Sequence, residues 1–458
     1  MTNTPVNSRN LVLEMLLSNA KGEKSHIVLK NTLDQHPDLE KQERAFITRL
    51  FEGTIERKIE LDYIINQVSK IKTKKMKLVI LSILRMSVYQ LKYMDSVPEF
   101  AVCNEAVKLA KKRGFYNLKG FVNGVLRNVI KQMDTMEYPS EETMALSIQY
   151  SIPQWILELW IRDYGREQTK KCLESLYETK KTTVRIQKSK RNSGETEAAF
   201  YERIKEALKN DDVIVEETIL PFVIRISGYD SLNRLKVFQQ GLICVQDLSS
   251  VLVGVLANPQ KNSQVIDVCA APGGKSLCVA DFMDGTGMVE ARDLTEKKVS
   301  LIQENIKRCD IRNIKTKVFD ATQPDYTMRE TADLVIADLP CSGLGVIANK
   351  SDIKYNVSVQ QIQELATLQR EILQVVSEMV KPGGKLVFST CTVNRLENDE
   401  NAKWIQEKLG LCPVSIQEEI PKELLNGKTV TNQIQIFPGE FGMDGFFISV
   451  FEKPAKER

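Results

Sequence analysis

Residues 265–276 read Val-Ile-Asp-Val-Cys-Ala-Ala-Pro-Gly-Gly-Lys-Ser, and this stretch decides how the second half of the chain folds. Its β-branched start predicts a strand, and the apolar residues at 277–282 that follow it predict a helix. Between the two, a tight turn that a ligand can approach closely is predicted by Pro272, Gly273 and Gly274. A strand, a glycine turn and a helix in this order open the nucleotide sites of doubly wound α/β sheets.

Two common ligands of such a turn, phosphates and dinucleotides, are excluded because the sequence lacks the motifs that bind them. A phosphate-binding loop needs a glycine where Cys269 stands, and the G-x-G-x-x-G dinucleotide fingerprint is absent. A methyl-donor site remains, in which a loop of small residues passes beneath an adenosyl amino acid that carries no phosphate. From position alone, the alternative is an ordinary glycine turn without any ligand.

The bulk composition describes a folded protein of several domains. The chain has 458 residues, 42% of them hydrophobic and 27% charged, so we expect two or three domains with apolar cores. The first ten residues lack the apolar segment of a signal peptide, and no apolar run approaches the roughly 18 residues of a membrane helix. We therefore expect a cytoplasmic protein without a membrane partner.

Positive charge is concentrated at the front of the chain. Residues 1–140 hold 23 Lys and Arg against 15 Asp and Glu, a net charge of +8 in a chain whose total is +3. Such an excess predicts an anionic partner, most simply nucleic acid, although a lysine-rich helical surface exposed to solvent gives the same count.

The cysteines and histidines limit the chemistry. Nine cysteines without a C-x-x-C pair predict neither a disulfide framework nor a metal site. The two histidines, His26 and His36, both lie near the N-terminus, outside the α/β region. Mechanisms that pair serine or cysteine with histidine are therefore excluded there, and cysteine, aspartate and lysine are favoured.

The first part of the chain reads as helices. Apolar residues recur at helical spacing from residue 8 to about 133 and predict a compact domain of about five to seven helices. The run from Arg44 to Asp62, with YQLKYMDSVPEFAVCNEAVKLAKK and GFVNGVLRN further on, resembles the NusB-type RNA-binding helical fold. The resemblance implies that this domain, which we assign to residues 1–137, binds RNA.

A small α+β module is expected to link this domain to the α/β region. We assign it to residues 145–240, where helices are predicted at 154–164, 167–177 and 200–208, and strands at 182–187, 213–215 and 222–226. No catalytic residue is expected in this module.

Residues 241–458 are expected to form a Rossmann-like class I methyltransferase domain with a seven-stranded sheet. Parallel strands are predicted at 264–268, 287–292, 314–319, 333–337 and 385–390, with helices near 276–283, 295–309, 358–380 and 397–409. The segments 434–437 and 446–451 predict a closing antiparallel hairpin, which would reverse the last strand of the sheet.

Polar residues follow successive predicted strands. Asp293 is placed to accept hydrogen bonds from ribose hydroxyls and Asp320 to lie beside an adenine amino group, because ligands bind at the carboxyl ends of such strands. Either residue could instead cap a helix, Asp293 especially.

Two cysteines also leave the ends of neighbouring predicted strands, in Asp338-Leu339-Pro340-Cys341-Ser342-Gly343 and in Ser389-Thr390-Cys391-Thr392. A cysteine nucleophile is what methylation of a pyrimidine at C5 requires, because C5 becomes nucleophilic only after a thiolate has added to C6. A carboxyl group such as that of Asp338 can stabilise the N3 edge of the base, and Lys275 can support the thiolate. The thiols of Cys269, Cys278 and Cys309 are expected to be inert core groups.

The segments DVCAAPGGKS, ADLPCSG and STCTVNRLENDENA resemble the signature motifs of the Sun/RsmB-type 16S ribosomal RNA cytosine-5 methyltransferases, and the resemblance covers essentially the whole chain. It implies that Cys391 is the nucleophile and that Cys341 assists product release. It also implies that S-adenosylmethionine is bound by Cys269, Ala270, Ala271, Pro272, Gly273, Gly274, Lys275, Asp293, Asp320 and Asp338.

The same resemblance implies the partner and the reaction. The substrate is small-subunit (16S) ribosomal RNA, the base implied is the cytidine at position 967, and we expect a monomer without a metal. Two alternatives remain, namely a non-catalytic RNA-binding or ribosome-assembly factor and a cytosine-5 methyltransferase of another RNA. The segment GVIANKSDIKY at 345–355 is less basic than the family pattern, so RNA contacts are not assigned to it, and Leu339 replaces the usual alanine.

Overall fold

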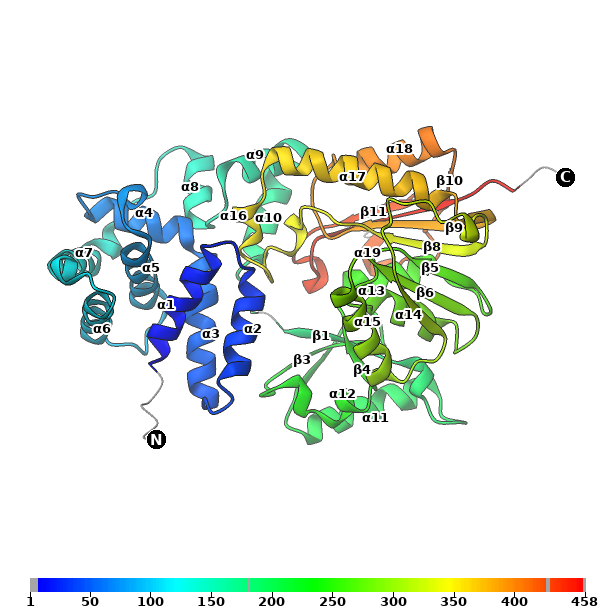
Figure 1. Cartoon of the computed structure of the whole chain (residues 1–458), viewed down its shortest axis with the longest axis horizontal. Coiled ribbons are helices and arrows are strands. Elements are labelled where there is room, and N and C mark those ends of the chain that lie inside the picture. Colours follow the sequence, from blue (N-terminus) through cyan, green and yellow to red (C-terminus); the bar gives the residue numbers. More distant parts are fainter. Residues whose placement is uncertain (1–6, 180, 426–428, 456–458) are drawn as a thin grey trace. The chain divides into compact units, whose positions relative to one another are not determined.

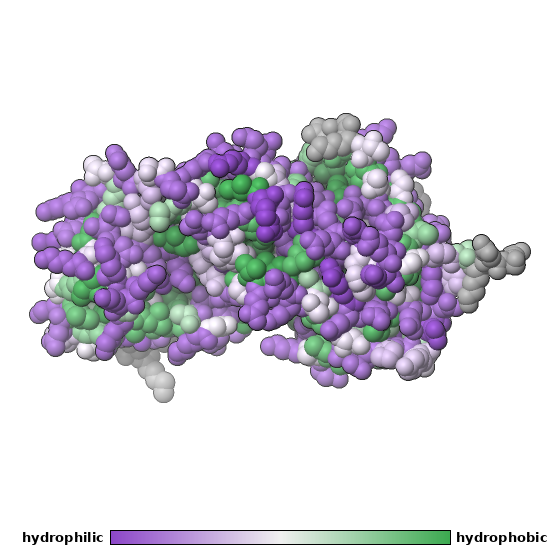
Figure 2. Space-filling model, turned by 90° about the horizontal axis from the view of Figure 1, so that it is seen from above, coloured by the Kyte–Doolittle hydropathy of each residue, from purple (hydrophilic) through white to green (hydrophobic). Residues whose placement is uncertain are grey.

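The computed structural model describes residues 7–179, 181–425 and 429–455. The chain divides into two compact units (Figure 1). The first comprises the residues up to Thr169 together with Asn349–Asn356, and the second comprises Lys170–Ala348 and the chain from Val357 onward. On the face drawn in Figure 2, hydrophilic residues cover most of the surface, and hydrophobic residues show as separate patches.

The first unit is helical, as the apolar spacing predicted. Seven α-helices lie within the described residues 8–132, and three more follow in this unit. They are α1 (Ser8–Asn19), α2 (Ser25–Gln35), α3 (Lys41–Glu56), α4 (Lys58–Val68), α5 (Leu78–Tyr93), α6 (Glu99–Lys112), α7 (Lys119–Gln132), α8 (Glu142–Gln149), α9 (Gln154–Tyr164) and the short α16 (Ile353–Asn356).

Helix α5 lies at the centre of this unit, in contact with α1, α3, α4, α6 and α7. Its residues Ile80, Ile83, Leu84 and Val88 recur at helical spacing and are all buried. The predicted helical domain therefore has one apolar core, which collects residues from all seven of its helices.

The segment Asn349–Asn356 folds with the helical unit although the residues before and after it in the sequence belong to the second unit. Asp352 accepts hydrogen bonds from the backbone N–H of Ser25 (2.9 Å) and from its Oγ (2.7 Å). The ammonium of Lys354, only 1% exposed, donates to the carbonyl oxygen of Glu56 at 2.9 Å. This part of the less basic 345–355 run is thus occupied by contacts within the protein.

The second unit begins with a small antiparallel sheet in the order β2-β3-β1-β4. Its strands are β1 (Thr182–Ile186), β2 (Ile214–Glu217), β3 (Val223–Ser227) and β4 (Ile243–Val245), accompanied by α11 (Glu197–Asn210) and α12 (Lys236–Gln239), and α10 (Arg166–Ser175) precedes them. Strand β4 was not predicted. It is only three residues long, which is too short to show an alternating pattern, and it forms a strand because it pairs with β1.

The larger sheet of this unit has the order β10-β12-β9-β8-β5-β6-β7, with β11 paired to β12. Its strands are β5 (Gln264–Asp267), β6 (Met288–Asp293), β7 (Ile314–Val318), β8 (Ala332–Asp338), β9 (Val380–Thr390), β10 (Cys412–Pro413), β11 (Gln433–Ile436) and β12 (Phe446–Glu452). The five central strands are parallel, and β12 runs antiparallel to β9, as predicted. The predicted count of seven strands is wrong for the described chain, because the two-residue β10 adds an eighth at the edge.

Helices cover both faces of this sheet (Figure 1). Alternate strand residues belong to different cores, so that Val265 packs with one set of helices and its neighbour Ile266 with the other. The helices are α13 (Leu248–Ala257), α14 (Gly274–Phe282), α15 (Glu296–Cys309), α17 (Val359–Ser377), α18 (Asp399–Leu409) and α19 (Lys422–Leu425). Strand order reverses between β5 and β8, and ligands of such sheets bind at the carboxyl ends of the strands on either side of this point.

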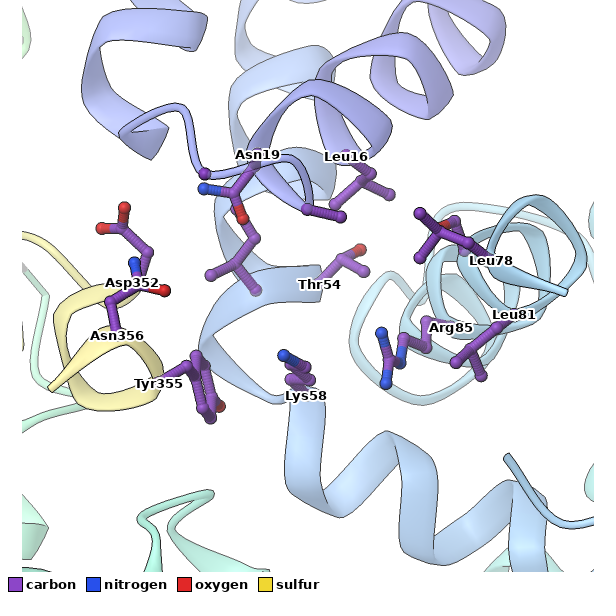
Figure 3. Close-up of a pocket in the computed structure, with 14 residues that line it drawn as sticks. Leu16, Asn19, Thr54, Lys58, Leu78, Leu81, Arg85, Asp352, Tyr355 and Asn356 are labelled. Atoms are coloured by element: carbon purple, nitrogen blue, oxygen red, sulfur yellow. The ribbon is translucent and has the colours of Figure 1, made fainter. Parts of the chain in front are cut away.

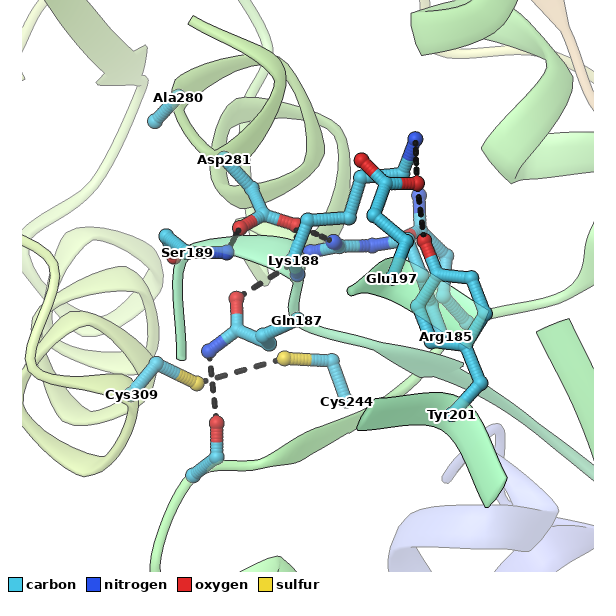
Figure 4. Close-up of polar contacts among 12 residues, drawn as sticks. Arg185, Gln187, Lys188, Ser189, Glu197, Tyr201, Cys244, Ala280, Asp281 and Cys309 are labelled. Carbon is cyan, nitrogen blue, oxygen red and sulfur yellow. Dashed lines mark hydrogen bonds and ion pairs between the residues drawn. The ribbon is translucent and has the colours of Figure 1, made fainter. Parts of the chain in front are cut away.

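A buried polar network joins the small sheet to α14 (Figure 4). Arg185 on β1 is fully buried and donates to the carboxylate of Asp281 at 2.5 Å. The same carboxylate accepts the backbone N–H groups of Lys188 (2.9 Å) and Ser189 (2.7 Å). Because a buried ion pair needs such additional donors to offset its desolvation, this arrangement specifies how the small sheet packs beside the glycine turn.

Candidate active site

The glycine turn connects β5 to α14 and is held in place by the neighbouring strand β6. Gly273 has φ 105°, a left-handed conformation that favours glycine, and an added Cβ would lie 3.2 Å from Ile302. The backbone N–H of Ala270 donates to the carbonyl of Arg292 at 2.8 Å. Ala271, Pro272, Gly274 and Lys275, from the predicted donor loop, are not fully buried. The turn is therefore a fixed backbone surface that a ligand can approach.

Asp267, at the end of β5, is a fully buried carboxylate beneath this turn. Its Oδ2 accepts a hydrogen bond from Ser276 at 2.6 Å, whereas Oδ1 has no hydrogen-bond partner among the described residues. Burial, with a further contribution from the charge of Asp338, raises the pKa of Asp267 to about 7. Asp267 ends a strand, where ligands of such sheets bind, but its sequence position did not predict a buried oxygen left available there.

The aspartates after the second and third parallel strands differ in their contacts. The carboxylate of Asp293 accepts a hydrogen bond from the backbone N–H of Ala271 (2.9 Å) and forms an ion pair with Lys298 (2.9 Å). It therefore holds the backbone of the glycine turn in position. Thr295, and not Asp293, is the N-cap of α15, which removes the expected alternative of a helix cap. Asp320 is half-buried after β7, with one carboxylate oxygen bonded by Thr322.

The two predicted cysteines meet at the ends of β8 and β9. Their sulfur atoms are 3.2 Å apart, and both side chains are partly exposed. The hydrogen bond to Cys391, and then burial, raise the pKa of the Cys341 thiol well above its ordinary value. Cys341 therefore keeps its proton and can donate it to the sulfur of Cys391.

Asp338 and Lys275 form an ion pair beside these sulfurs. The ammonium of Lys275 lies 2.7 Å from the carboxylate of Asp338, which also accepts the hydroxyl of Ser389 at 2.8 Å. Burial by itself lowers the pKa of Lys275, but the charge of Asp338 offsets burial and the net pKa is raised. Lys275 thus stays a cation, and the negative charge of a Cys391 thiolate contributes to holding it so.

Glu397 ties the two cysteine loops together, and sequence reasoning missed it. The side chain is fully buried. It accepts hydrogen bonds from the Ser342 N–H (2.9 Å), the Gln369 amide (3.0 Å) and the Asn394 amide (2.5 Å), and also from the Ser342 hydroxyl. Burial raises the pKa of Glu397, with these donors partly opposing the rise. The signal available in the sequence was the N-x-x-E spacing from Asn394 to Glu397.

Two further observations concern metal binding and membrane spans. Among the residues that the structure describes, no three or more His, Cys, Asp or Glu side chains are grouped so as to hold a metal ion. Within the same described ranges, no helix is both long enough and apolar enough to cross a bilayer.

Comparison with known proteins agrees with this architecture. Residues 254–452 match the family model of the 16S rRNA methyltransferase RsmB/F, and residues 6–131 match the NusB family. The probable ribosomal RNA small subunit methyltransferase B of Bacillus subtilis is 34% identical over 97% of this chain and 98% of its own. Its counterpart in Synechocystis is 29% identical over 98% of this chain and 100% of its own.

A solved structure has a similar fold over nearly the full length of the chain. The crystal structure of PH0851 superposes with a TM-score of 0.81 and covers 98% of this chain and 100% of its own, at 22% sequence identity.

These findings first define a class, the RNA methyltransferases that join a NusB-like helical domain to a Rossmann-like methyltransferase domain. Within it, the chain belongs to the ribosomal RNA small subunit methyltransferase B family, because the similarity to the Bacillus subtilis relative extends over nearly the full length of both chains.

Proposed function

We propose that the protein transfers a methyl group from S-adenosylmethionine to C5 of a cytidine in 16S ribosomal RNA, through a covalent bond between Cys391 and C6 of the base. The family supports ribosomal RNA methylation, and the observation that carries the mechanism is the 3.2 Å contact between two sulfurs beside the glycine turn. The base at position 967 is the substrate that the resemblance suggests.

The glycine turn and its surroundings fit the methyl donor. The unpaired oxygen of buried Asp267 is an acceptor that a donor group of the ligand would satisfy. We assign the adenosyl amino acid to the set from Cys269 to Lys275 with Asp293, Asp320 and Asp338, and we add Asp267. When bound, S-adenosylmethionine supplies an electrophilic methyl group.

The first step makes C5 of the base nucleophilic. The thiol of Cys391 releases its proton to solvent, as the one net proton of the reaction, and its sulfur bonds to C6, while the ion pair of Asp338 and Lys275 stabilises the charge that develops at the N3 edge. The base must be unpaired or flipped, because C6 is shielded in a stacked helix. C5 then bonds to the methyl group, whose bond to the sulfonium sulfur of the donor breaks and leaves that sulfur as an uncharged thioether.

Product release uses the second cysteine. The proton that Cys341 shares with Cys391 passes to the departing sulfur as the bond to C6 breaks. The Cys341 thiolate left behind accepts the proton from C5, and the double bond between C5 and C6 is restored. Both thiols end the cycle protonated, so atoms and charge balance.

The remaining assignments follow from this reaction. We propose residues 1–137 as the RNA-binding domain, 145–240 as the linking module and 241–458 as the catalytic domain. A protein with this substrate works in the cytoplasm, where ribosomes are assembled. The two alternatives stay distinguishable, because an assembly factor would bind RNA without transferring methyl groups and a different substrate would show as transfer to another RNA.

The test is methyl transfer from labelled S-adenosylmethionine to 16S ribosomal RNA by the wild-type protein and by Cys341→Ala. Wild type is expected to place label on C5 of cytidine. Cys341→Ala is expected to accumulate a protein–RNA adduct stable to denaturant. Label on a different atom or no adduct would contradict the mechanism.

A further inference from the structure

The helical unit contains a hollow that the proposed mechanism does not use (Figure 3). Its volume is about 370 Å³, within the range of small-ligand sites. It lies between the C-terminal ends of α1 and α3, the start of α4, the first two turns of α5 and the short α16, and all of its lining residues belong to this one unit. The hollow is therefore a feature of the helical unit itself.

Two cations point into this hollow (Figure 3). The guanidinium of Arg85 is held by the carboxylate of Asp62 through two hydrogen bonds of 2.7 Å. The ammonium of Lys58 lies 4.7 Å from the ring centre of Tyr355, and burial and the charge of Arg85 both lower its pKa. Within the described residues, Lys58 has no carboxylate of its own at ion-pair distance, since Asp62 is engaged by Arg85.

The second carboxylate at the hollow, that of Asp352, is also engaged. It accepts two hydrogen bonds from Ser25 and is only 5% exposed. Lys58 and Leu78 are the first residues of α4 and α5. In the described chain neither N-cap residue caps its helix with a side chain, but the first turn of α4 contains the acidic Glu60, whose backbone N–H donates to Ser151 Oγ at 3.0 Å. The positive start of α5, whose first turn has no acidic residue, thus lies beside two cations, which is an arrangement that attracts an anion.

The rest of the lining suits a nucleotide rather than a bare anion. Leu16, Leu78 and Leu81 present apolar surface, Tyr355 adds an aromatic ring, and the amides of Asn19 and Asn356 are polar groups of the kind that bind base edges. Leu78, at the rim, is 41% exposed. The exposed lysines Lys72, Lys74, Lys75 and Lys77 lead up to this rim along the chain, as a path for a phosphate backbone would require.

We infer that this hollow binds one unpaired nucleotide of an RNA strand, with its phosphate on Lys58 and Arg85 and its base against Leu78 and Tyr355. A free nucleotide shares this chemistry, whereas inorganic phosphate lacks the base. The inference rests on the proposed function only for the identity of the RNA, since the hollow takes no part in methyl transfer.

The experiment titrates the full-length protein into a labelled single-stranded RNA of about ten nucleotides and records fluorescence anisotropy at two salt concentrations. Lys58→Met removes the ammonium and keeps most of the stem. Lys131→Met makes the same change at an exposed lysine of α7 outside the hollow and is the matched control. Leu78→Glu places an anion at the exposed rim, where the fold tolerates it.

Lys58→Met and Leu78→Glu are expected to weaken RNA binding about tenfold relative to Lys131→Met. Lys58→Met is also expected to reduce the slope of log binding constant against log salt concentration by about 0.7, which corresponds to the loss of one phosphate contact on a single strand. Cytidine monophosphate is expected to displace the RNA at a lower concentration than inorganic phosphate. Equal affinities for Lys58→Met and Lys131→Met would overturn the inference, as would displacement by phosphate as effective as that by the nucleotide.

Methyl transfer to 16S ribosomal RNA is measured on the same wild-type preparation. Absence of transfer with RNA binding that depends on Lys58 refutes only the proposed function. Active transfer with RNA binding indifferent to Lys58 refutes only the nucleotide site.

Discussion

Asp267 should make the protein less stable as pH rises, and Asp267→Asn should remove most of this effect. Burial raises the pKa of this carboxyl from 3.8 to about 7, so between these values the folded protein holds a proton that the unfolded chain has lost. Stability contributed by the protonated form is present at low pH and is lost as pH rises through this window. The loss is about 1.4 kcal/mol per pH unit, or about 4 kcal/mol over the roughly three units of the window.

The assay is urea unfolding of wild type and Asp267→Asn at about pH 5 and pH 8, in the absence of methyl donor. On going to the higher pH, the free energy of unfolding of wild type should fall by about 2–3 kcal/mol more than that of Asp267→Asn. Asp320→Asn makes the same change at a half-buried strand-end carboxylate and is the control for the loss of a carboxylate. A difference between wild type and Asp267→Asn that is independent of pH would refute the reasoning.

Three further results are expected. Cys341→Ala should retain methyl-donor binding and trap the RNA adduct on denaturing gels; free RNA alone would contradict its role in release. Glu397→Gln should lower the methylation rate about a hundredfold, because the loops that carry Cys341 and Cys391 would be misplaced, and the affinity for the methyl donor measured by calorimetry should not change. An unchanged rate would show that Glu397 is not needed to position these loops. Arg185→Met alone should cost about 3–5 kcal/mol of unfolding free energy in urea titrations, and Arg185→Met with Asp281→Leu clearly less; equal losses would contradict the buried pair.

Much of the fold could be predicted because its elements carry local signals. The β-branched start of 265–276 and its glycines predicted β5 and the turn, and the apolar run after them predicted α14. The helical spacing of apolar residues from 8 to about 133, Leu81 and Leu84 among them, predicted the helices that include α5. The meeting of Cys341 with Cys391 could also be expected, since parallel strands end at one edge of a sheet.

The features that were missed depend on contacts between distant residues. Glu397 reaches the Cys341 loop through Ser342, which lies 55 positions earlier in the chain, and no local pattern encodes that distance. Asp352 joins the helical unit through Ser25, which no spacing predicts. Likewise, β4 and β10 are too short to show a period and exist because a neighbouring strand pairs with them.

The central claim is that Cys391 forms the bond to the base. The most direct measurement is mass spectrometry of the protein after incubation with S-adenosylmethionine and an RNA that carries 5-fluorocytidine, whose fluorine cannot leave as the C5 proton does. Wild-type protein is expected to yield an RNA-linked peptide containing Cys391, and Cys391→Ala is expected to yield none while still binding the donor. A crosslink at Cys341 in the wild type, or an undiminished adduct in Cys391→Ala, would contradict the account.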